Sequence, residues 1–237
     1  RGWGQGPSHS QSFETVFAQI PEITVIMPVY PNDSQLTFDL FRHLKTPTIS
    51  LEHRWTHYSV DTSESVRNTK VESYVAIEGF DLSLVAYSFN VLLSVRLASL
   101  MNNYGISIEV INLFCISKLN MACIYKSIEK TRNLLIVDSD DRNFGVGSQV
   151  LSSLILEKPM LTSQTKRIKR LCNKGIYSPS SPTLSNDYYL KISDLAKEIF
   201  NIINIDTLTK EKIINECYAI EGLRPHDVPS QSFSGPF

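Results

Sequence analysis

Strand and helix patterns alternate between residues 82 and 171, and this alternation restricts the fold more than any other feature of the sequence. Strands are expected at 82–87, 106–113, 134–137 and 159–162, and helices at 90–104, 120–130 and 146–157. Alternation of this kind predicts an α/β fold, with a mostly parallel sheet and helices on both of its faces. Ligands of such sheets bind beyond the carboxyl ends of the strands.

The residues before this region resemble the end of another α/β unit. Helices are expected at 11–19 and 34–44, and strands at 23–27 and 48–51. Phe13, Val16 and Phe17 would share one face of the first helix, and Asn32 or Asp33 can cap the second. A polar, weakly periodic stretch then predicts a linker. Two further helices, at 190–203 and 209–220, would follow the alternating region.

Charge and cysteine usage narrow the classes of partner. The net charge is −1, so no electrostatic footprint for nucleic acid or an anionic membrane is present. No apolar run reaches the roughly 20 residues that a membrane span needs. The four cysteines form no CxxC pair and no zinc-like spacing, which predicts reduced thiols and a cytoplasmic protein. The basic run 166–170 is expected to be a solvated strand or loop.

His9 is the first candidate for chemistry, because it follows a glycine-rich loop and precedes a helix. A histidine there can exchange protons near neutral pH and face a pocket. The alternative is a surface histidine beside Ser10, which would cap the helix. The chain also starts within that loop and without a methionine, so we expect a fragment of a longer protein.

Two other clusters have a ligand-binding and a structural interpretation. The turn 144–147 follows a strand and opens a helix, so it could bind an anion or simply connect the two elements. The second half of a dinucleotide fingerprint is missing, which favours the connection. Asp138, with two further aspartates, could bind Mg²⁺ or cap that helix, and the cap is favoured. His53 and His57 are more typical of a pocket lining or an interface than of a metal site.

Several segments, taken in order, resemble one enzyme family. They are His9-Ser10-Gln11-Ser12, Val25-Ile26-Met27-Pro28, Pro47-Thr48-Ile49-Ser50-Leu51-Glu52-His53-Arg54-Trp55, Leu84-Val85-Ala86-Tyr87-Ser88, Leu135-Ile136-Val137-Asp138 and Phe144-Gly145-Val146-Gly147. The sequence is similar to transketolase-like thiamine-diphosphate enzymes, above all to the beta subunit of 2-oxoacid dehydrogenase decarboxylating components of the pyruvate and branched-chain type.

The resemblance implies a division of the chain. Residues 1–61 would be the C-terminal part of a pyrimidine-binding α/β domain, and 62–79 a linker. Residues 80–205 would form a transketolase C-terminal-type three-layer sandwich with a mostly parallel sheet. Residues 206–237 would be a C-terminal helix and an extended tail.

The resemblance also implies chemistry and partners. His9 would handle protons beside thiamine diphosphate, and Arg1 and Gln11 would support the cofactor from the same loop. Thiamine diphosphate and Mg²⁺ belong to the complete enzyme, an oxidoreductase acting on pyruvate or another 2-oxoacid. The chain lacks the activating glutamate and the diphosphate-binding domain, so alone it is expected to be inactive and to hold no cofactor or metal. Expected partners are a second copy, a subunit or region with the diphosphate-binding domain, and an acyltransferase core.

Two other functions remain open at this point. The α/β domain could be a non-catalytic interaction module, or it could bind a small molecule or nucleotide at the turn 144–147. The family usually has Pro-Leu-Asp where Lys118-Leu119-Asn120 stands here, and this departure leaves the substrate undefined.

Overall fold

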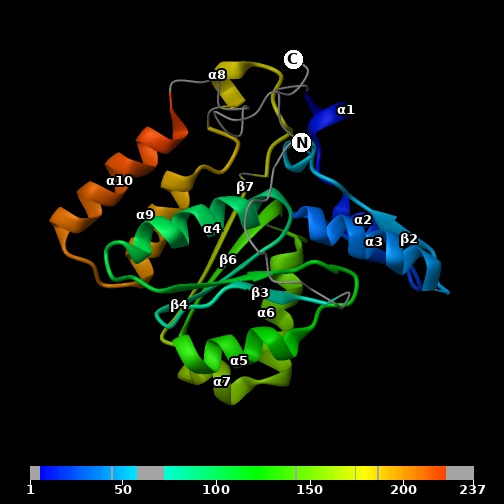
Figure 1. Ribbon diagram of the computed structural model, residues 1–237, viewed down its shortest axis with the longest axis horizontal. Helices are drawn as coiled ribbons and strands as arrows, with labels where there is room; N and C mark the ends of the chain where they lie inside the picture. Colours follow the sequence, from blue (N-terminus) through cyan, green and yellow to red (C-terminus); the bar gives the residue numbers. More distant parts are fainter. Residues whose placement is uncertain are drawn as a thin grey trace.

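A five-stranded sheet forms the centre of the protein in a computed structural model that describes residues 6–43, 45–57, 72–141, 143–173, 175–185 and 187–222 (Figure 1). Its strands are β3 (Tyr74–Ile77), β4 (Leu82–Ala86), β5 (Ile108–Asn112), β6 (Asn133–Asp141) and β7 (Arg167–Asn173). They lie in the order β3-β5-β4-β6-β7, and all neighbours are parallel except β3 and β5. The predicted mostly parallel α/β sheet is confirmed.

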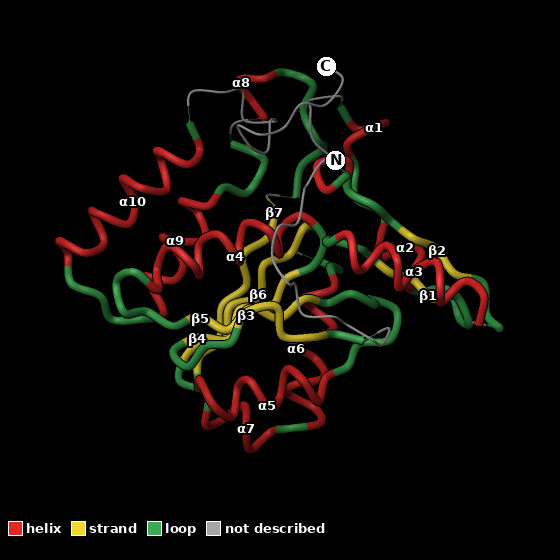
Figure 2. Tube along the Cα trace, in the orientation of Figure 1, coloured by secondary structure: helices red, strands yellow, loops and turns green. Residues whose placement is uncertain are grey.

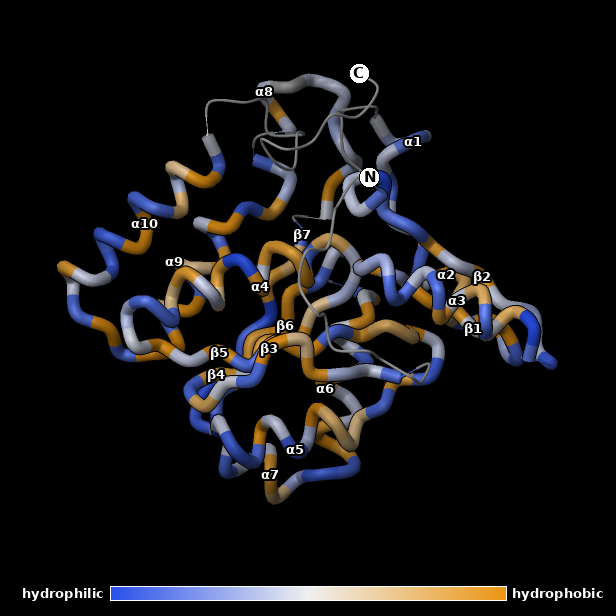
Figure 3. Tube along the Cα trace, in the orientation of Figure 1, coloured by the Kyte–Doolittle hydropathy of each residue, from blue (hydrophilic) through white to orange (hydrophobic). Residues whose placement is uncertain are grey.

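Helices cover both faces of this sheet (Figure 2). One face packs against α4 (Phe89–Asn102), α9 (Ile192–Ile202) and α10 (Thr207–Glu221), and the other against α5 (Met121–Thr131), α6 (Val146–Glu157) and α7 (Pro159–Gln164). Leu84 of β4 points into the first core and its neighbour Val85 into the second, as the two-residue period of a strand requires. The result is the expected three-layer sandwich, with its hydrophobic residues concentrated at the centre (Figure 3).

The structure corrects one strand and adds another. Residues 159–162 were expected to be a strand, but they belong to helix α7, which has Pro159 in its first turn, where the missing N–H costs nothing. Strand β3 lies where a linker was expected, at the end of 62–79. Residues 58–71 lie outside the described part of the chain, so the domain boundary there stays a prediction. The basic run 166–170 lies largely in strand β7, where exposed and partly buried residues alternate near the start of the strand.

A second, two-stranded parallel sheet consists of β1 (Thr24–Ile26) and β2 (Thr48–Ser50), joined through α3 (Pro31–His43). It is tied to the large sheet by the segment after β5. The Met27 amide donates to the Phe114 carbonyl at 2.8 Å, and the Ile116 amide donates to the Val25 carbonyl at 3.0 Å. The small sheet is therefore held beside the carboxyl end of β5.

Helix α3 begins at Pro31, three residues earlier than expected, so Asp33 lies inside its first turn. The carboxylate of Asp33 accepts hydrogen bonds from the amides of Val29 and Tyr30 at 3.0 Å each, and from the hydroxyl of Tyr74. Burial raises the pKa of Asp33 despite these bonds. Asp33 was expected to precede the helix as its N-cap, but it is the third residue of the helix, and its carboxylate instead holds the amides of two residues that precede the helix. The hydroxyl of Tyr74 ties this helix to β3.

The short helices α1 (Pro7–Ser10) and α2 (Glu14–Ala18) differ from the single helix expected at 11–19. Phe13, Val16 and Phe17 were expected to share one helix face, but Phe13 precedes α2, and Phe13 and Val16 are 53% and 56% exposed. The other short elements are η1 (Arg54–Thr56) and α8 (Pro182–Ser185). No helix in the described residues is both long and apolar enough to cross a membrane. All four cysteines are free thiols.

Acidification should weaken the fold through Glu109 of β5. Burial alone would raise the pKa of Glu109, but hydrogen bonds, chiefly from Lys130, outweigh it and hold that pKa below its usual value. A carboxyl group whose pKa is lower in the folded than in the unfolded protein stabilises the fold at pH values above its unfolded-state pKa. That stabilisation is lost as the pH falls through its folded-state pKa. Urea unfolding at pH 7 and at about pH 3.5 should therefore show a larger loss for the wild type than for Glu109→Gln. Equal losses would contradict this prediction.

Candidate functional site

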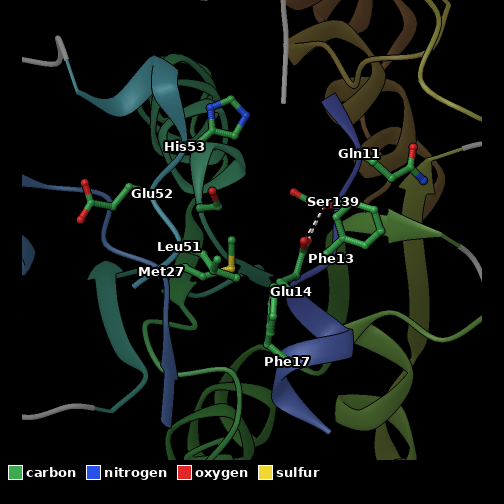
Figure 4. Close-up of a pocket in the computed structure, with 11 residues that line it drawn as sticks. Gln11, Phe13, Glu14, Phe17, Met27, Leu51, Glu52, His53 and Ser139 are labelled. Carbon is green, nitrogen blue, oxygen red and sulfur yellow. Dashed lines mark hydrogen bonds between the residues drawn. The ribbon is translucent and has the colours of Figure 1, made fainter. Parts of the chain in front are cut away.

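A cavity of about 200 Å³ lies where the carboxyl ends of both sheets meet (Figure 4). It is lined by Gln11, Ser12, Phe13, Glu14, Phe17, Met27, Leu51, Glu52, His53, Ser88 and Ser139. Glu52 and His53 stand on one wall, after β2, and Gln11 and Glu14 on the opposite wall. Ser88 follows β4, and Ser139 lies in the carboxyl half of β6.

The topology of the large sheet explains why a cavity forms at this edge. Strand β5 lies on one side of β4, and β6 and β7 lie on the other. The connection that leaves β4 and the connection that leaves β6 therefore run to opposite sides, which opens a crevice between the two strand ends. Ser88 and Ser139 stand at these two ends.

Ser88 combines strain, burial and an unsatisfied hydroxyl. Its φ is 57°, in the left-handed region that side chains other than glycine rarely adopt. It is 1% exposed, and within the described residues its Oγ has no hydrogen-bond partner. Gln11 Oε1 is likewise buried and unsatisfied. Such groups cost free energy unless they gain a partner, and strained residues of this kind cluster at ligand sites.

His53 joins this cavity to a second, smaller one. The Nδ1 atom of His53 accepts a hydrogen bond from the Trp55 amide at 3.2 Å, so the ring can present Nε2–H. Its ring stacks on Phe89 with centroids 5.3 Å apart, and Trp55 meets Phe89 edge-on. The second cavity is lined by His53, Trp55, Phe89, Asn90, Ser139, Asn173, Tyr189 and Leu190. The pocket-lining role predicted for the 52–57 cluster is confirmed for His53.

The N-terminus of α6 is occupied by the protein's own carboxylate. Asp138 is fully buried, its Oδ2 accepts the Gly147 amide at 2.7 Å, and it forms an ion pair with Arg170 at 2.7 Å. The Tyr87 hydroxyl also donates to Asp138. The capping role favoured for Asp138 is confirmed. A nucleotide phosphate would have to displace this carboxylate, so the turn 144–147 is a structural connection.

Replacing Gly147 by alanine should destabilise the protein, although alanine is the better helix former by about 1 kcal/mol. A Cβ at this position would lie 2.7 Å from Asp138 Oδ2 and 2.8 Å from Arg170 Nε. Overpacking of this kind costs about 1–3 kcal/mol. Urea unfolding measures the change, with Ser152→Ala on an exposed position of the same helix as the matched control. A Gly147→Ala variant as stable as the wild type would refute the close packing around Asp138.

The structure separates the three residues predicted to serve the site. Gln11 lines the cavity. His9 lies on α1 with an exposed side chain and is not in the lining of either cavity. Arg1 lies outside the described residues. Their catalytic and cofactor-binding roles stay predictions. Sequence reasoning missed Glu14, Ser88 and Ser139, although the last two stand where ligands of parallel sheets bind.

Potential metal ligands are not gathered in this site. In the described ranges, no group of three or more His, Cys, Asp or Glu side chains is placed to hold a metal ion. His53 and His57 do not form a metal pair, because Nε2 of His57 bonds to Glu52 at 3.1 Å.

The sheet and its cavity define an α/β protein of the kind that binds ligands at a strand-end crevice. The family "Transketolase, C-terminal domain" matches residues 72–195, more than half of the sequence. The chain belongs to this family.

Three similar proteins place the chain within it. The mitochondrial pyruvate dehydrogenase E1 component subunit beta of Saccharomyces cerevisiae is 26% identical over 209 residues, which are 86% of this chain and 57% of the relative. The corresponding subunit of Bacillus subtilis is 31% identical, over 65% of this chain and 50% of the relative. A solved structure, "Split gene transketolase, inactive beta4 tetramer", matches with a TM-score of 0.65 at 16% identity, over 88% of this chain and 63% of that one, which shows the shared fold. The chain spans about half the length of the curated relatives.

Proposed function

We propose that the chain is the C-terminal portion of a thiamine-diphosphate-dependent 2-oxoacid dehydrogenase component. Its role would be assembly and one edge of the active site. The similarity to pyruvate dehydrogenase E1 beta subunits over most of the chain carries this proposal. That similarity extends over 209 residues, more than the family match at residues 72–195 covers.

The described residues fit one edge of a thiamine-diphosphate site but not its diphosphate end. The helix N-terminus that could receive a phosphate is taken by Asp138. No group of potential metal ligands lies in the described ranges to hold Mg²⁺. By contrast, Gln11 lines the cavity, and its Oε1 is buried without a hydrogen-bond partner among the described residues. This oxygen could accept a hydrogen bond from an N–H group of an organic ligand.

Each residue of the loop would have a separate task. When bound, thiamine diphosphate supplies the electron sink for decarboxylation of a 2-oxoacid. His9, exposed on α1, would hold or release a proton at its imidazole near the reacting group. Gln11 would accept a hydrogen bond and orient the bound molecule, and Arg1 would support the same loop. The partner that carries the diphosphate-binding domain would complete the site.

The proposed assembly has three parts. A second copy of this chain would form a homodimer, a subunit or region with the diphosphate-binding domain would join it, and an acyltransferase core would receive the product. The location is proposed to be cytoplasmic, in keeping with the four free thiols.

Thiamine diphosphate with Mg²⁺ should not raise the melting temperature of the isolated chain, because ligand binding stabilises only a protein that holds the ligand. The complete enzyme should show that rise, and it should decarboxylate a 2-oxoacid in the presence of an artificial electron acceptor. Thermal unfolding and an acceptor-reduction assay make the two measurements. A Mg²⁺-dependent rise for the isolated chain would refute the division of the site between chains. A complete enzyme that turns over no 2-oxoacid would refute the proposed reaction.

A further inference from the structure

Glu14 is a buried carboxylate with little to balance its charge. It is 3% exposed, and both of its oxygens accept from a single hydroxyl, that of Ser12, at 2.8 and 2.6 Å. Across the described residues, no lysine or arginine forms an ion pair with it. A buried carboxylate is normally paired with a cation or with several donors, because removing the charge from water costs several kcal/mol.

The cavity beside Glu14 is rich in hydrogen-bond acceptors. Glu52 is also in the lining, but its carboxylate bonds to Nε2 of His57 and points away from Glu14 in Figure 4, so Glu14 is the carboxylate that faces the cavity from this set; no lysine or arginine is among the described lining residues. Ser88 Oγ and Gln11 Oε1 are buried there without a hydrogen-bond partner on the described chain. A cavity with these walls repels an anion and favours a positively charged group with several N–H donors.

The apolar part of the lining suits the same kind of group. Phe13 and Phe17 contribute aromatic rings, and Met27 contributes a thioether. A cation over an aromatic face is attracted by the ring quadrupole, more strongly where water is excluded. The cavity volume of 200 Å³ corresponds to about seven water-sized groups, at ~30 Å³ each, which accommodates a guanidinium with its methylene stem.

Exposed apolar side chains beside the cavity indicate a protein partner. Phe13, just before α2, Val16 within it and Ile20 just beyond it are 53%, 56% and 44% exposed. A small soluble cation would leave this surface in water. A polypeptide that covers α2 would bury it while one side chain enters the cavity.

We propose that this cavity receives an arginine side chain from a partner polypeptide whose flanking apolar residues pack on Phe13 and Val16. Arginine is favoured over lysine because its planar guanidinium can bind Glu14 through two parallel N–H groups and still donate to Ser88 or Gln11. The inference does not depend on the proposed reaction, since it concerns only the contact between this surface and another chain.

Three short peptides test the proposal by isothermal titration calorimetry on the full 237-residue chain. Acetyl-Leu-Arg-Leu-amide is compared with the citrulline analogue, which has the same shape without the charge, and with acetyl-Gly-Arg-Gly-amide. We expect the Leu-Arg-Leu peptide to bind at least about tenfold more tightly than either comparison peptide, because charge complementarity and apolar contact both contribute. Glu14→Gln should abolish the preference for arginine over citrulline. Val16→Ser should abolish the preference for leucine over glycine.

The comparison of peptides on the wild type stands even if a variant fails to fold. Glu211→Gln, at an exposed acid on α10, is the matched control and should retain both preferences. Equal binding of the arginine and citrulline peptides would overturn the assignment of a cation site. Equal binding of the leucine and glycine peptides would overturn the partner polypeptide and leave a site for a small cation. Thiamine diphosphate is absent from these titrations, so their outcome is independent of the proposed enzymatic function.

Discussion

Arg170→Met should lower the free energy of unfolding by about 3–5 kcal/mol, because it leaves a buried charge without its counter-ion. Asp138 is fully buried, and its ion pair with Arg170 is 2.7 Å long. The methionine keeps most of the stem that packs along the sheet, so the loss comes mainly from the charge. Urea unfolding followed by circular dichroism measures it.

Two further variants separate the charge from the packing. Lys169→Met changes the neighbouring residue, whose side chain is 50% exposed and whose contact with Glu198 is 3.9 Å long, so it should alter stability by less than about 0.5 kcal/mol. The double variant Arg170→Met with Asp138→Asn removes both charges and should recover part of the loss. If the free energy of unfolding of Arg170→Met lay within about 1 kcal/mol of the wild-type value, the buried ion pair would have little influence on stability.

His9→Ala in the complete enzyme should reduce kcat by about 10²–10⁴-fold, the usual contribution of a positioned acid or base. His9 is exposed on α1, so its removal should leave the core and the assembly unchanged. The steady-state rate of 2-oxoacid-dependent acceptor reduction gives kcat, and size-exclusion chromatography reports the assembly.

His43→Ala provides the matched control, because His43 is an exposed histidine in the last turn of α3 and is absent from both cavity linings. It should retain the wild-type kcat. If His9→Ala also retained kcat with its assembly intact, the loop would have no part in proton transfer, and the non-catalytic interaction module would become the better interpretation.

The order of strands and helices was predictable because each element carries its own periodicity. Strand β4 is buried along its whole length, and α6 begins and ends where the pattern of apolar residues does. Several elements with weaker signals were missed, among them β3 and α7. All four residues of β3 are only partly buried at the edge of the sheet, and α7 is six residues long and starts with a proline that also suits the end of a strand.

The cavity could not be predicted in the same way, because its walls come from five separate parts of the sequence, around residues 11–17, 27, 51–53, 88 and 139. Gln11, His53, Ser88 and Ser139 share no local pattern, and only the strand order brings them together. The role of Asp138 was easier to predict, since the residue that fills a helix start lies close to that helix in sequence. Phe13 and Val16 are exposed, although an apolar helix face is normally expected to pack against the core of its own chain.

The hydrogen bonds between β1 and the segment after β5 also restrict how the cavity can move. The small sheet cannot move away from the large sheet here without breaking the bonds from Met27 to Phe114 and from Ile116 to Val25. Met27 is therefore held in the cavity lining before a ligand arrives, so this part of the site needs no ordering on binding and adds no entropic cost to it.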